Sequence, residues 1–548
     1  MCGIAGIVVK DNNRLKISDL KKMTDAIAHR GPDSEGFWLS EEQNIGLGHR
    51  RLSIIDLSKE SDQPMQSTCG NFVIIFNGEI YNYIELKEDL ISKGEVFSTN
   101  SDTEVLLKLY ILEKEKCLSK LDGMWAFAIW DKSEKSLFCA RDRFGEKPFH
   151  YYNDEKGFYF ASEMKALWEA GIPKVKNENM FELFEKNGSI HNPKNLRETF
   201  YKNIFRLEHS HWMKINENNQ LIIQRYYDIP WENQNFTGSF DDAQKKFNKL
   251  FNESLQRRLR SDVKVGTSLS GGLDSSSIVS IIAKENKNLI AFSARFNGFK
   301  KDESYFIDQI IKQNEIRGIS VYPNGDEMYN DFKKLCYHQE EPFGSASIYA
   351  QYCVQSLAKE NNVTVLIDGQ GADEILGGYI FYYNSFIKRL NSIQKYSLNN
   401  IKEQWRYIDF HGHLKGWKKF IYKYCLIFLF DKKEKTNSLN KMLYDSTMNG
   451  PLQDLLRYAD RNSMANHREI RLPFLSKDLV EFCFSLPDNY KLKMGWTKYI
   501  LRKSFENDLP NEVCWRKEKV GFETPQASWL EKFNNDNWNE IMIKEFSK

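Results

Sequence analysis

Hydrophobic and polar positions follow different patterns in the two halves of the chain. In the first 205 residues, short apolar runs are broken by Gly, Asn and Asp, as in Val73–Phe76, Trp125–Trp130 and Phe158–Phe160. Runs of this length, bounded by turn-forming residues, are typical of β-strands, and Asn77-Gly78 predicts a turn after the first of them. Many strands with few long helices predict an α+β domain built as a sandwich of antiparallel sheets.

Beyond about residue 242 the pattern changes to strands that alternate with helices. A helical pattern from Ala243 to Leu259 precedes the apolar runs Val263–Leu269, Leu289–Ser293 and Val363–Ile367, with helical stretches between them. Strands separated by helices predict a parallel sheet with right-handed crossovers. This half is therefore expected to be an α/β domain.

The length of the chain also predicts more than one domain. A single hydrophobic core stops growing near roughly 250–300 residues, and this chain has 548. We predict a first domain over 1–205, a linker over 206–241 and a second domain over 242–548. The linker is clearest from Tyr226 to about Asp241, where core residues are few, and residues 380–450 are expected to form a helical insertion without proline.

Composition narrows the class of protein. The 77 Lys and Arg residues balance 75 Asp and Glu residues, so the basic excess of a nucleic-acid-binding protein is missing. The nine cysteines show no CxxC or zinc spacing, which predicts a cytoplasmic protein with free thiols. No signal peptide is evident. The most apolar stretch, Ile421–Phe430, is about half of the roughly 20 residues of a membrane span, so we expect a buried helix there, with an interfacial helix as the alternative.

Cys2 directly follows the initiator Met1. Removal of Met1 would leave a thiol and a free α-amine on one carbon atom. Because an α-amine has a pKa of roughly 7.7–8.0, much of it is neutral near pH 7 and can act as a base for the thiol. A cysteine at the second position is a weak signal alone. Together with the motifs below, it predicts cleavage of a carboxamide through a thioester.

The run Ser270-Gly271-Gly272-Leu273-Asp274-Ser275 lies between a predicted strand and a predicted helix. Its glycines let the backbone approach a ligand, and its N–H groups with the helix N-terminus form an anion site. The common phosphate loop GxxxxGK(S/T) is missing. The run suits the pyrophosphate that leaves when ATP adenylates a carboxylate, with Asp274 as a candidate Mg²⁺ ligand.

Together these two signals resemble the glutamine-dependent asparagine synthetases, and the resemblance covers nearly the whole chain. The supporting motifs, in order, are His29–Asp33, Arg51–Asp56, Asn77–Asn82, Ser101–Glu104, Arg141–Gly145, Ala161–Leu167, Asp460–Ala465 and Leu472–Leu475. The resemblance implies an Ntn-hydrolase-like class II glutamine amidotransferase domain followed by an ATP-pyrophosphatase synthetase domain. It also implies that glutamine, ATP and a carboxylate acceptor are the substrates and that ATP and Mg²⁺ are the cofactors. A homodimer is one assembly that it leaves open.

In the first domain, the resemblance implies a pocket for glutamine next to Cys2. Arg51 would pair with the carboxylate of glutamine, which suits its planar fork. Glu79 and Asp102 would hold the α-ammonium group. The side-chain amide of Asn77 and the backbone N–H of Gly78 would form the oxyanion hole.

Two other groups near these motifs are interpreted as structural. His29 and His49 are not needed as bases, because the nucleophile brings its own amine. Arg457, Asp460 and Arg461 have the spacing of one helix face. We expect them to form an ion-pair network that joins the two halves or shapes the path of ammonia.

In the second domain, the resemblance implies a nucleotide site with two carboxylates. Asp373 would be the second Mg²⁺ ligand beside Asp274. Lys519 would stabilise the phosphate charge, with Lys517 as the alternative. The remaining residues expected at ATP and pyrophosphate are Leu269, Ser270, Gly271, Gly272, Ser275, Ala294, Asp368 and Gly369.

The chain departs from the family where the acceptor should bind. Aspartate-using bacterial relatives carry Gly-Glu-Gly and Ile-Arg-Ala where this chain has Gln370 and Tyr349 at the central positions. Both changes alter charge, and both residues are assigned to the acceptor pocket. We expect an asparagine synthetase-type ligase that most simply converts aspartate to asparagine. The alternative is the same chemistry on another carboxylate, such as a sugar uronic acid in surface polysaccharide biosynthesis or a specialised metabolite.

Overall fold

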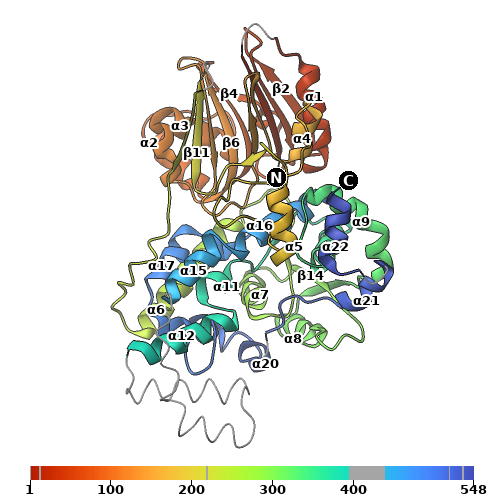
Figure 1. Ribbon diagram of the computed structural model, residues 1–548. Coiled ribbons are helices and arrows are strands. Elements are labelled where there is room, and N and C mark those ends of the chain that lie inside the picture. Colours follow the sequence, from red (N-terminus) through yellow and green to blue (C-terminus); the bar gives the residue numbers. More distant parts are fainter. Residues whose placement is uncertain are drawn as a thin grey trace, which may run out of the picture.

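The structure is a computed structural model that describes residues 2–10, 14–216, 220–393, 438–517, 519–533 and 536–547. It has an N-terminal domain with two antiparallel sheets and a C-terminal domain around a parallel sheet (Figure 1). The N-terminal domain, red to yellow in Figure 1, sits on the C-terminal domain, green to blue. The predicted order, an antiparallel sandwich followed by an α/β domain, is confirmed.

The N-terminal domain is a sandwich of two six-stranded sheets. The first has the order β10-β8-β9-β1-β3-β2 and the second β12-β11-β7-β6-β5-β4. Apolar side chains from both sheets, such as Ile4, Leu47, Val73 and Ala126, form the core between them. The strands are β1 (Gly3–Val9), β2 (Ser34–Leu39), β3 (Ile45–Arg51), β4 (Met65–Gln66), β5 (Phe72–Ile80), β6 (Gly123–Asp131), β7 (Ser136–Arg141), β8 (His150–Asn153), β9 (Gly157–Ala161), β10 (Phe205–Arg206), β11 (His211–Asn216) and β12 (Leu221–Arg225).

Helices cover the outer faces of this sandwich. α1 (Ile17–Ala26) and α4 (Met164–Glu169) pack on the first sheet, and α3 (Asp102–Glu113), with α2 (Tyr83–Ser92) against it, packs on the second. α5 (Glu178–Asn187) instead contacts the C-terminal helix α22 (Trp538–Phe546). Because both sheets are covered on both faces, their strands are largely buried.

The linker predicted over 206–241 is too long. β11 and β12 lie inside that range, and β11 pairs with β7, so the second sheet continues to Arg225. Helix α6 (Phe240–Arg258) starts the second domain, which leaves 226–239 as the connection. β12 is an edge strand whose side chains are half-buried or exposed. The boundary was missed because its apolar run, Leu221–Ile223, is only three residues long and does not show that the strand pairs with β11.

The turn predicted at Asn77-Gly78 is also wrong. β5 runs through both residues, with Asn77 opposite Ala126 and Gly78 opposite Trp125 of β6. A Cβ atom on Gly78 would lie 2.1 Å from the backbone oxygen of Met124. The glycine is therefore required by the close approach of the neighbouring strand, a known reason for glycine within strands.

The C-terminal domain contains a five-stranded parallel sheet of order β15-β14-β13-β16-β17. Its strands are β13 (Val265–Ser268), β14 (Ile290–Ala294), β15 (Arg317–Val321), β16 (Val365–Ile367) and β17 (Glu469–Arg471). Its other helices are α7 (Leu273–Glu285), α8 (Ser304–Asn314), α9 (Gly325–Gln339), α10 (Ser347–Glu360), α11 (Ala372–Leu376), α12 (Ile380–Ile393), α15 (Leu439–Met448), α16 (Pro451–Ala465), α17 (Lys477–Ser485), α18 (Asp488–Lys491), α19 (Tyr499–Phe505), α20 (Asn511–Cys514) and α21 (Gln526–Leu530).

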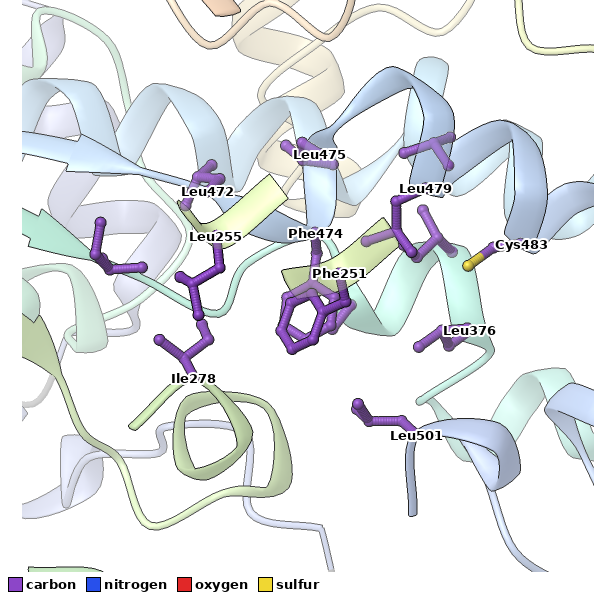
Figure 2. Packing of buried hydrophobic residues seen from close by; sticks show 14 of the residues in the cluster. Phe251, Leu255, Ile278, Leu376, Leu472, Phe474, Leu475, Leu479, Cys483 and Leu501 are labelled. Carbon is purple, nitrogen blue, oxygen red and sulfur yellow. The ribbon is translucent and has the colours of Figure 1, made fainter. Parts of the chain in front are cut away.

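A large apolar cluster packs against this sheet. The rings of Phe251 on α6 and Phe474 stack with centroids 4.5 Å apart, and Leu255, Ile278 and Leu479 pack around them (Figure 2). The cluster fixes α6, α7 and α17 against the sheet, and thereby holds the loops at the strand ends in place.

Only the ends of the predicted helical insertion are described. α12 and α15 are helical, as expected, whereas 394–437, with the apolar stretch Ile421–Phe430, lies outside the described residues. Within the described part of the chain, no helix combines the length and apolarity that crossing a membrane requires. The eight cysteines in that part carry free thiols.

Candidate active sites

Cys2 lies just before β1, at the end of the sandwich and between its two sheets. Its side chain is buried, and its backbone nitrogen donates a hydrogen bond to Oδ1 of Asn77 on β5 at 3.0 Å. Nε of Arg30 donates to the carbonyl oxygen of Cys2 at 3.0 Å, and Sγ lies 4.0 Å from the carbonyl oxygen of Leu52. The candidate nucleophile is thus held by Asn77 on β5 and by Arg30, which precedes β2.

An amide donor without a partner lies beside this thiol. Since Oδ1 of Asn77 accepts from Cys2, its Nδ2 remains as a buried donor with no hydrogen-bond partner. Gly78 follows on the same strand. A buried donor that is left unpaired costs free energy, and such donors next to a nucleophile are the components of an oxyanion hole.

Burial raises the pKa of the Cys2 thiol, although the terminal amine and the Arg51 guanidinium oppose this shift. The resting thiol is therefore neutral and needs a base. Arg51 itself is buried and donates to the carbonyl oxygen of Ser58 at 2.7 Å, to Asp62 at 2.8 Å and to the carbonyl oxygen of Asp56. Arg51 is close enough to lower the pKa of the thiol, but its guanidinium is hydrogen-bonded to the loop that contains Asp56, Ser58 and Asp62.

The two carboxylates predicted to hold an ammonium group lie together in the same region. Oδ2 of Asp102 accepts from the backbone N–H of Ile80 at 2.9 Å, and burial raises the pKa of Asp102 to about 6. Burial, Glu469 and Asp102 raise the pKa of Glu79 well above its usual range, and its Oε2 is buried without a hydrogen-bond partner. Buried carboxylates whose pKa values are raised favour a cationic ligand.

The two histidines have structural partners. Nε2 of His49 lies 3.1 Å from the carbonyl oxygen of Phe76, and burial lowers the pKa of His49 to about 3, so the ring stays neutral. Nε2 of His29 lies 3.1 Å from Oε2 of Glu163. Both contacts support the structural interpretation made from the sequence.

The second site is a cavity of about 340 Å³ at the carboxyl ends of β13, β14 and β16. In open α/β sheets, ligands bind at this edge. The residues predicted at ATP, Mg²⁺ or the acceptor that line the cavity are Leu269, Ser270, Gly272, Asp274, Ser275, Ala294, Asp368, Gly369, Gln370, Asp373 and Lys519, together with the alternative Lys517. The sheet topology therefore gathers segments that are far apart in the sequence.

A lysine that the sequence did not reveal lies at the centre of this cavity. Nζ of Lys498 contacts Asp274 at 2.7 and 2.5 Å and Asp373 at 2.5 Å, and Lys519 also pairs with Asp373. Burial opposes ionisation, but the two lysines together lower the pKa of Asp373 to about 2. Among the described residues, Asp274 forms its ion pair with Lys498, and burial raises its pKa. No motif or spacing marks Lys498, which lies 224 positions from Asp274.

The protein supplies only some of the ligands that Mg²⁺ needs, namely two carboxylates. Asp274 and Asp373 share one ammonium partner, so their carboxylates converge. Mg²⁺ is typically held by one or two carboxylates together with substrate phosphates and water. Throughout the described residues, no group of three or more His, Cys, Asp or Glu side chains could hold a metal. These two carboxylates fit an ion that reaches the site with the phosphates.

Gly271 was predicted to contact the pyrophosphate, but it does not line the cavity. Its φ is +76°, and a Cβ atom there would lie 3.0 Å from Cβ of Phe306 on α8. The residue is needed for the left-handed turn and for the packing of α8 against the loop. The structure thus gives Gly271 a role in the loop geometry, and its contact with pyrophosphate stays a prediction.

Tyr349 was assigned to the acceptor pocket and also lies outside the cavity lining. α10 presents Ser347, Ile348, Gln351 and Val354 to the cavity. Tyr349 lies on another face of the helix, where its hydroxyl donates to Asp331 at 3.0 Å. The correction follows from the helical period, because adjacent positions point about 100° apart. Of the two predicted acceptor residues, Gln370 alone lines the cavity.

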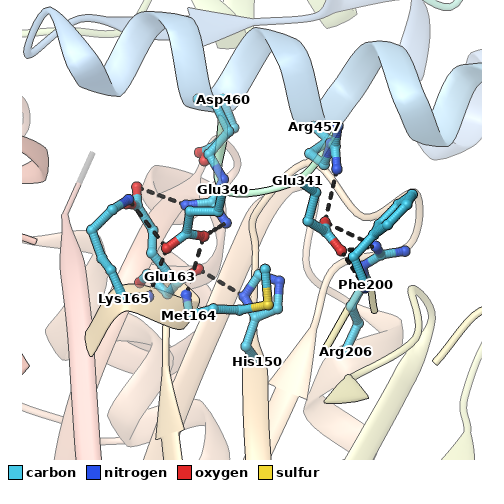
Figure 3. A network of polar contacts seen from close by, with 12 residues as sticks. His150, Glu163, Met164, Lys165, Phe200, Arg206, Glu340, Glu341, Arg457 and Asp460 are labelled. Carbon is cyan, nitrogen blue, oxygen red and sulfur yellow. Dashed lines mark hydrogen bonds and ion pairs between the residues drawn. The ribbon is translucent and has the colours of Figure 1, made fainter. Parts of the chain in front are cut away.

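A buried ion-pair network joins the two domains (Figure 3). On α16, Asp460 accepts two bonds from Arg30, at 2.8 and 2.9 Å, and Arg461 pairs with Glu163 at 2.9 Å. Glu340 and Glu341, after α9, extend the network to Arg461 and Arg457 at 2.7 Å each. The predicted network between the halves is confirmed. Through Arg30, it reaches the backbone of Cys2.

Asp460→Asn is expected to destabilise the enzyme strongly. The variant takes a charged partner from the buried Arg30, which then keeps only its pair with Glu163 at 2.7 Å among the described residues. Breaking one partner of a buried pair typically costs about 3–5 kcal/mol. The matched control is Asp454→Asn on the same helix, because its side chain is 26% exposed and pairs with His191; such pairs contribute about 0–1 kcal/mol. Urea unfolding of both variants tests this, and equal midpoints would contradict it.

The comparisons with known proteins fall on these two domains. The family described as "Glutamine amidotransferase domain" matches residues 1–227, and the family described as "Asparagine synthase" matches residues 246–546. Asparagine synthetase [glutamine-hydrolyzing] 1 of Bacillus subtilis is 34% identical over 100% of this chain and 90% of its own length. A putative asparagine synthetase 2 of Methanocaldococcus jannaschii is 36% identical over 72% of this chain and 78% of its own.

A solved allosteric regulatory enzyme of purine biosynthesis matches with 16% identity and a TM-score of 0.32, over 58% of this chain and 80% of that one. This likeness is too low to support an argument. The two family matches and the full-length relative do support one, because they cover both domains in the order that the structure shows. The chain belongs to the glutamine-hydrolysing asparagine synthetase family, whose members are ATP-using ligases of the glutamine amidotransferase type.

Proposed function

We propose that this enzyme makes asparagine by transferring the amide nitrogen of glutamine to aspartate that ATP has activated. The observation that supports the nitrogen-releasing half is the contact between Cys2 and Asn77, which leaves an unpaired amide donor beside a buried thiol. The second half is supported by the lysine-bridged carboxylates in the cavity of the C-terminal domain.

In the first half-reaction, the thiol of Cys2 attacks the side-chain amide of glutamine. With Met1 removed, the α-amine of Cys2 takes the thiol proton, and this base is needed because burial keeps the thiol protonated. Nδ2 of Asn77 and the N–H of Gly78 donate to the developing oxyanion. The proton goes to the leaving nitrogen, ammonia departs, and water hydrolyses the γ-glutamyl thioester.

In the second half-reaction, the acceptor carboxylate attacks the α-phosphorus of ATP. Pyrophosphate leaves into the loop of Ser270 and Ser275, where Lys498 and Lys519 balance its charge. Mg²⁺, when held by Asp274 and Asp373, supplies further positive charge to the phosphates. Ammonia then attacks the acyl-adenylate and AMP leaves. Because ammonia in water at pH 7 is mostly ammonium, it must travel inside the protein.

Gln370 is the residue proposed to face the acceptor. It follows the predicted adenosine residues Asp368 and Gly369 and lines the cavity, and its Oε1 is buried without a hydrogen-bond partner. An unpaired carbonyl oxygen in a ligand cavity suits a donor on the ligand, such as the α-ammonium of aspartate. The names of the relatives also support aspartate.

The acceptor is tested by incubating the enzyme with ATP, Mg²⁺, glutamine and single acids. We expect pyrophosphate and asparagine in equal amounts with aspartate, because each activated acid is amidated once. Glucuronate and galacturonate serve as the comparison acids. Pyrophosphate release with a uronic acid but not with aspartate would overturn aspartate as the acceptor and keep the chemistry.

A further inference from the structure

We infer that Arg471 of the C-terminal domain is a positioning residue for the glutamine pocket of the N-terminal domain, acting through Glu79. The inference rests on the proposed function, because it takes Glu79 as the partner of the α-ammonium of glutamine. It adds to that function a dependence of glutamine binding on the other domain.

The guanidinium of Arg471 is fixed by its own domain. Arg471 is fully buried on β17, which pairs with β16 at the edge of the parallel sheet. Its Nε donates to Glu469 at 2.6 Å, and Nη1 donates to the carbonyl oxygens of Arg258 at 2.8 Å and Arg260 at 2.6 Å. These bonds leave Nη2, which has no hydrogen-bond partner, 3.8 Å from Oε1 of Glu79.

Only one carboxylate oxygen of Glu79 faces Arg471. Its Oε1 faces the guanidinium, while its Oε2 is buried and unpaired. The ionisable groups around it are Asp102 and Glu469, which raise its pKa, and Arg471 and the terminal amine, which lower it. Arg471 is therefore the side-chain cation that favours the ionised form of Glu79, the form that binds an ammonium group.

Tyr81, two residues further on, holds this segment against the C-terminal domain. Tyr81 is 1% exposed, and the guanidiniums of Arg258 and Arg471 lie 4.5 and 5.4 Å from the centre of its ring. Such cation–ring contacts are strongest where water is excluded. The position of Glu79 relative to Arg471 is thus set by packing at the interface.

The affinity for glutamine is expected to depend on pH through Glu79. Glutamine binds to ionised Glu79, so binding weakens as the pH falls through the pKa of this carboxyl. Removing Arg471 raises that pKa further and moves the loss of affinity to higher pH. Removing the charge of Glu469 lowers the pKa and moves the loss to lower pH. An opposite charge at this range shifts a carboxyl by about 1–3 pH units.

The test measures the Kd of glutamine by calorimetry from pH 6 to 8.5, in full-length enzyme carrying Cys2→Ala so that nothing turns over. We expect Arg471→Met to raise the Kd about tenfold at the acid end, which corresponds to about one pH unit, and less as the pH rises. Arg471→Lys keeps the charge but not the planar fork, so its curve should shift less than that of Arg471→Met, and Glu469→Gln should shift the curve to lower pH. With Glu79→Gln present, Arg471→Met should add no pH dependence.

Folding is checked by the rise in melting temperature that ATP with Mg²⁺ produces. An Arg471→Met variant that folds and keeps the parent curve overturns the inference. If that variant does not fold, the Glu469→Gln variant provides the test. A pH curve of the glutamine Kd that does not shift in Glu469→Gln also overturns the inference. Failure of the proposed function gives a different result: the parent Cys2→Ala protein, with Arg471 intact, would then bind no glutamine at any pH.

Discussion

Replacing Cys2 with alanine is expected to abolish glutamine-dependent product formation, while synthesis driven by added ammonium continues. The N-terminal site places this thiol beside the unpaired amide of Asn77. Loss of a covalent nucleophile costs many orders of magnitude in other hydrolases, so we expect a fall of at least about 10³-fold. Glutamate release and pyrophosphate release, measured separately, give the two activities.

The matched control for this result is Cys69→Ala. Cys69 is in the same domain, but it is exposed. It should keep both activities within about twofold, since surface substitutions have small effects. Glutamine-dependent synthesis that survives Cys2→Ala at the parent rate would show that the nitrogen comes from another site.

Replacing Lys498 with methionine is expected to impair the synthetase half of the reaction and to spare glutamine hydrolysis. Pyrophosphate release should fall by about 10²–10³-fold, as when a preorganised charge is removed from a developing anion, while glutamine hydrolysis continues. The variant leaves the carboxylates of Asp274 and Asp373 without the ammonium that joins them. The synthetase assay with saturating ammonium isolates this half of the reaction.

Lys503→Met on α19 is the control for Lys498. Lys503 pairs with Glu506 and is 30% exposed, against 5% for Lys498. A partly exposed pair contributes about 0–1 kcal/mol, so activity should be unchanged. If both variants lose pyrophosphate release equally, α19 supports the cavity through its packing, and the charge of Lys498 has no special role.

A local sequence pattern does not fix the direction of a side chain or the partner of a strand. Tyr349 and Ile348 are neighbours in the sequence, yet one helix directs Ile348 to the cavity and Tyr349 to Asp331. Gly271 belongs to a ligand-binding motif but packs on α8. β12 was taken as linker because its short apolar run, Leu221–Ile223, does not by itself show that the strand pairs with β11. Each error concerns the direction of a side chain or the partner of a strand.

The order of the two domains, Cys2 and the run Ser270–Ser275 could be recognised from the sequence, because apolar periodicity and short motifs are local properties of the chain. The tertiary structure alone decided that Lys498 joins two carboxylates, and that Arg471 faces Glu79 across the interface. These pairs are made by sheet order and domain packing, which bring together residues that no spacing connects. Side-chain charges act over a few ångströms, so their effect is known only once the fold has set those distances.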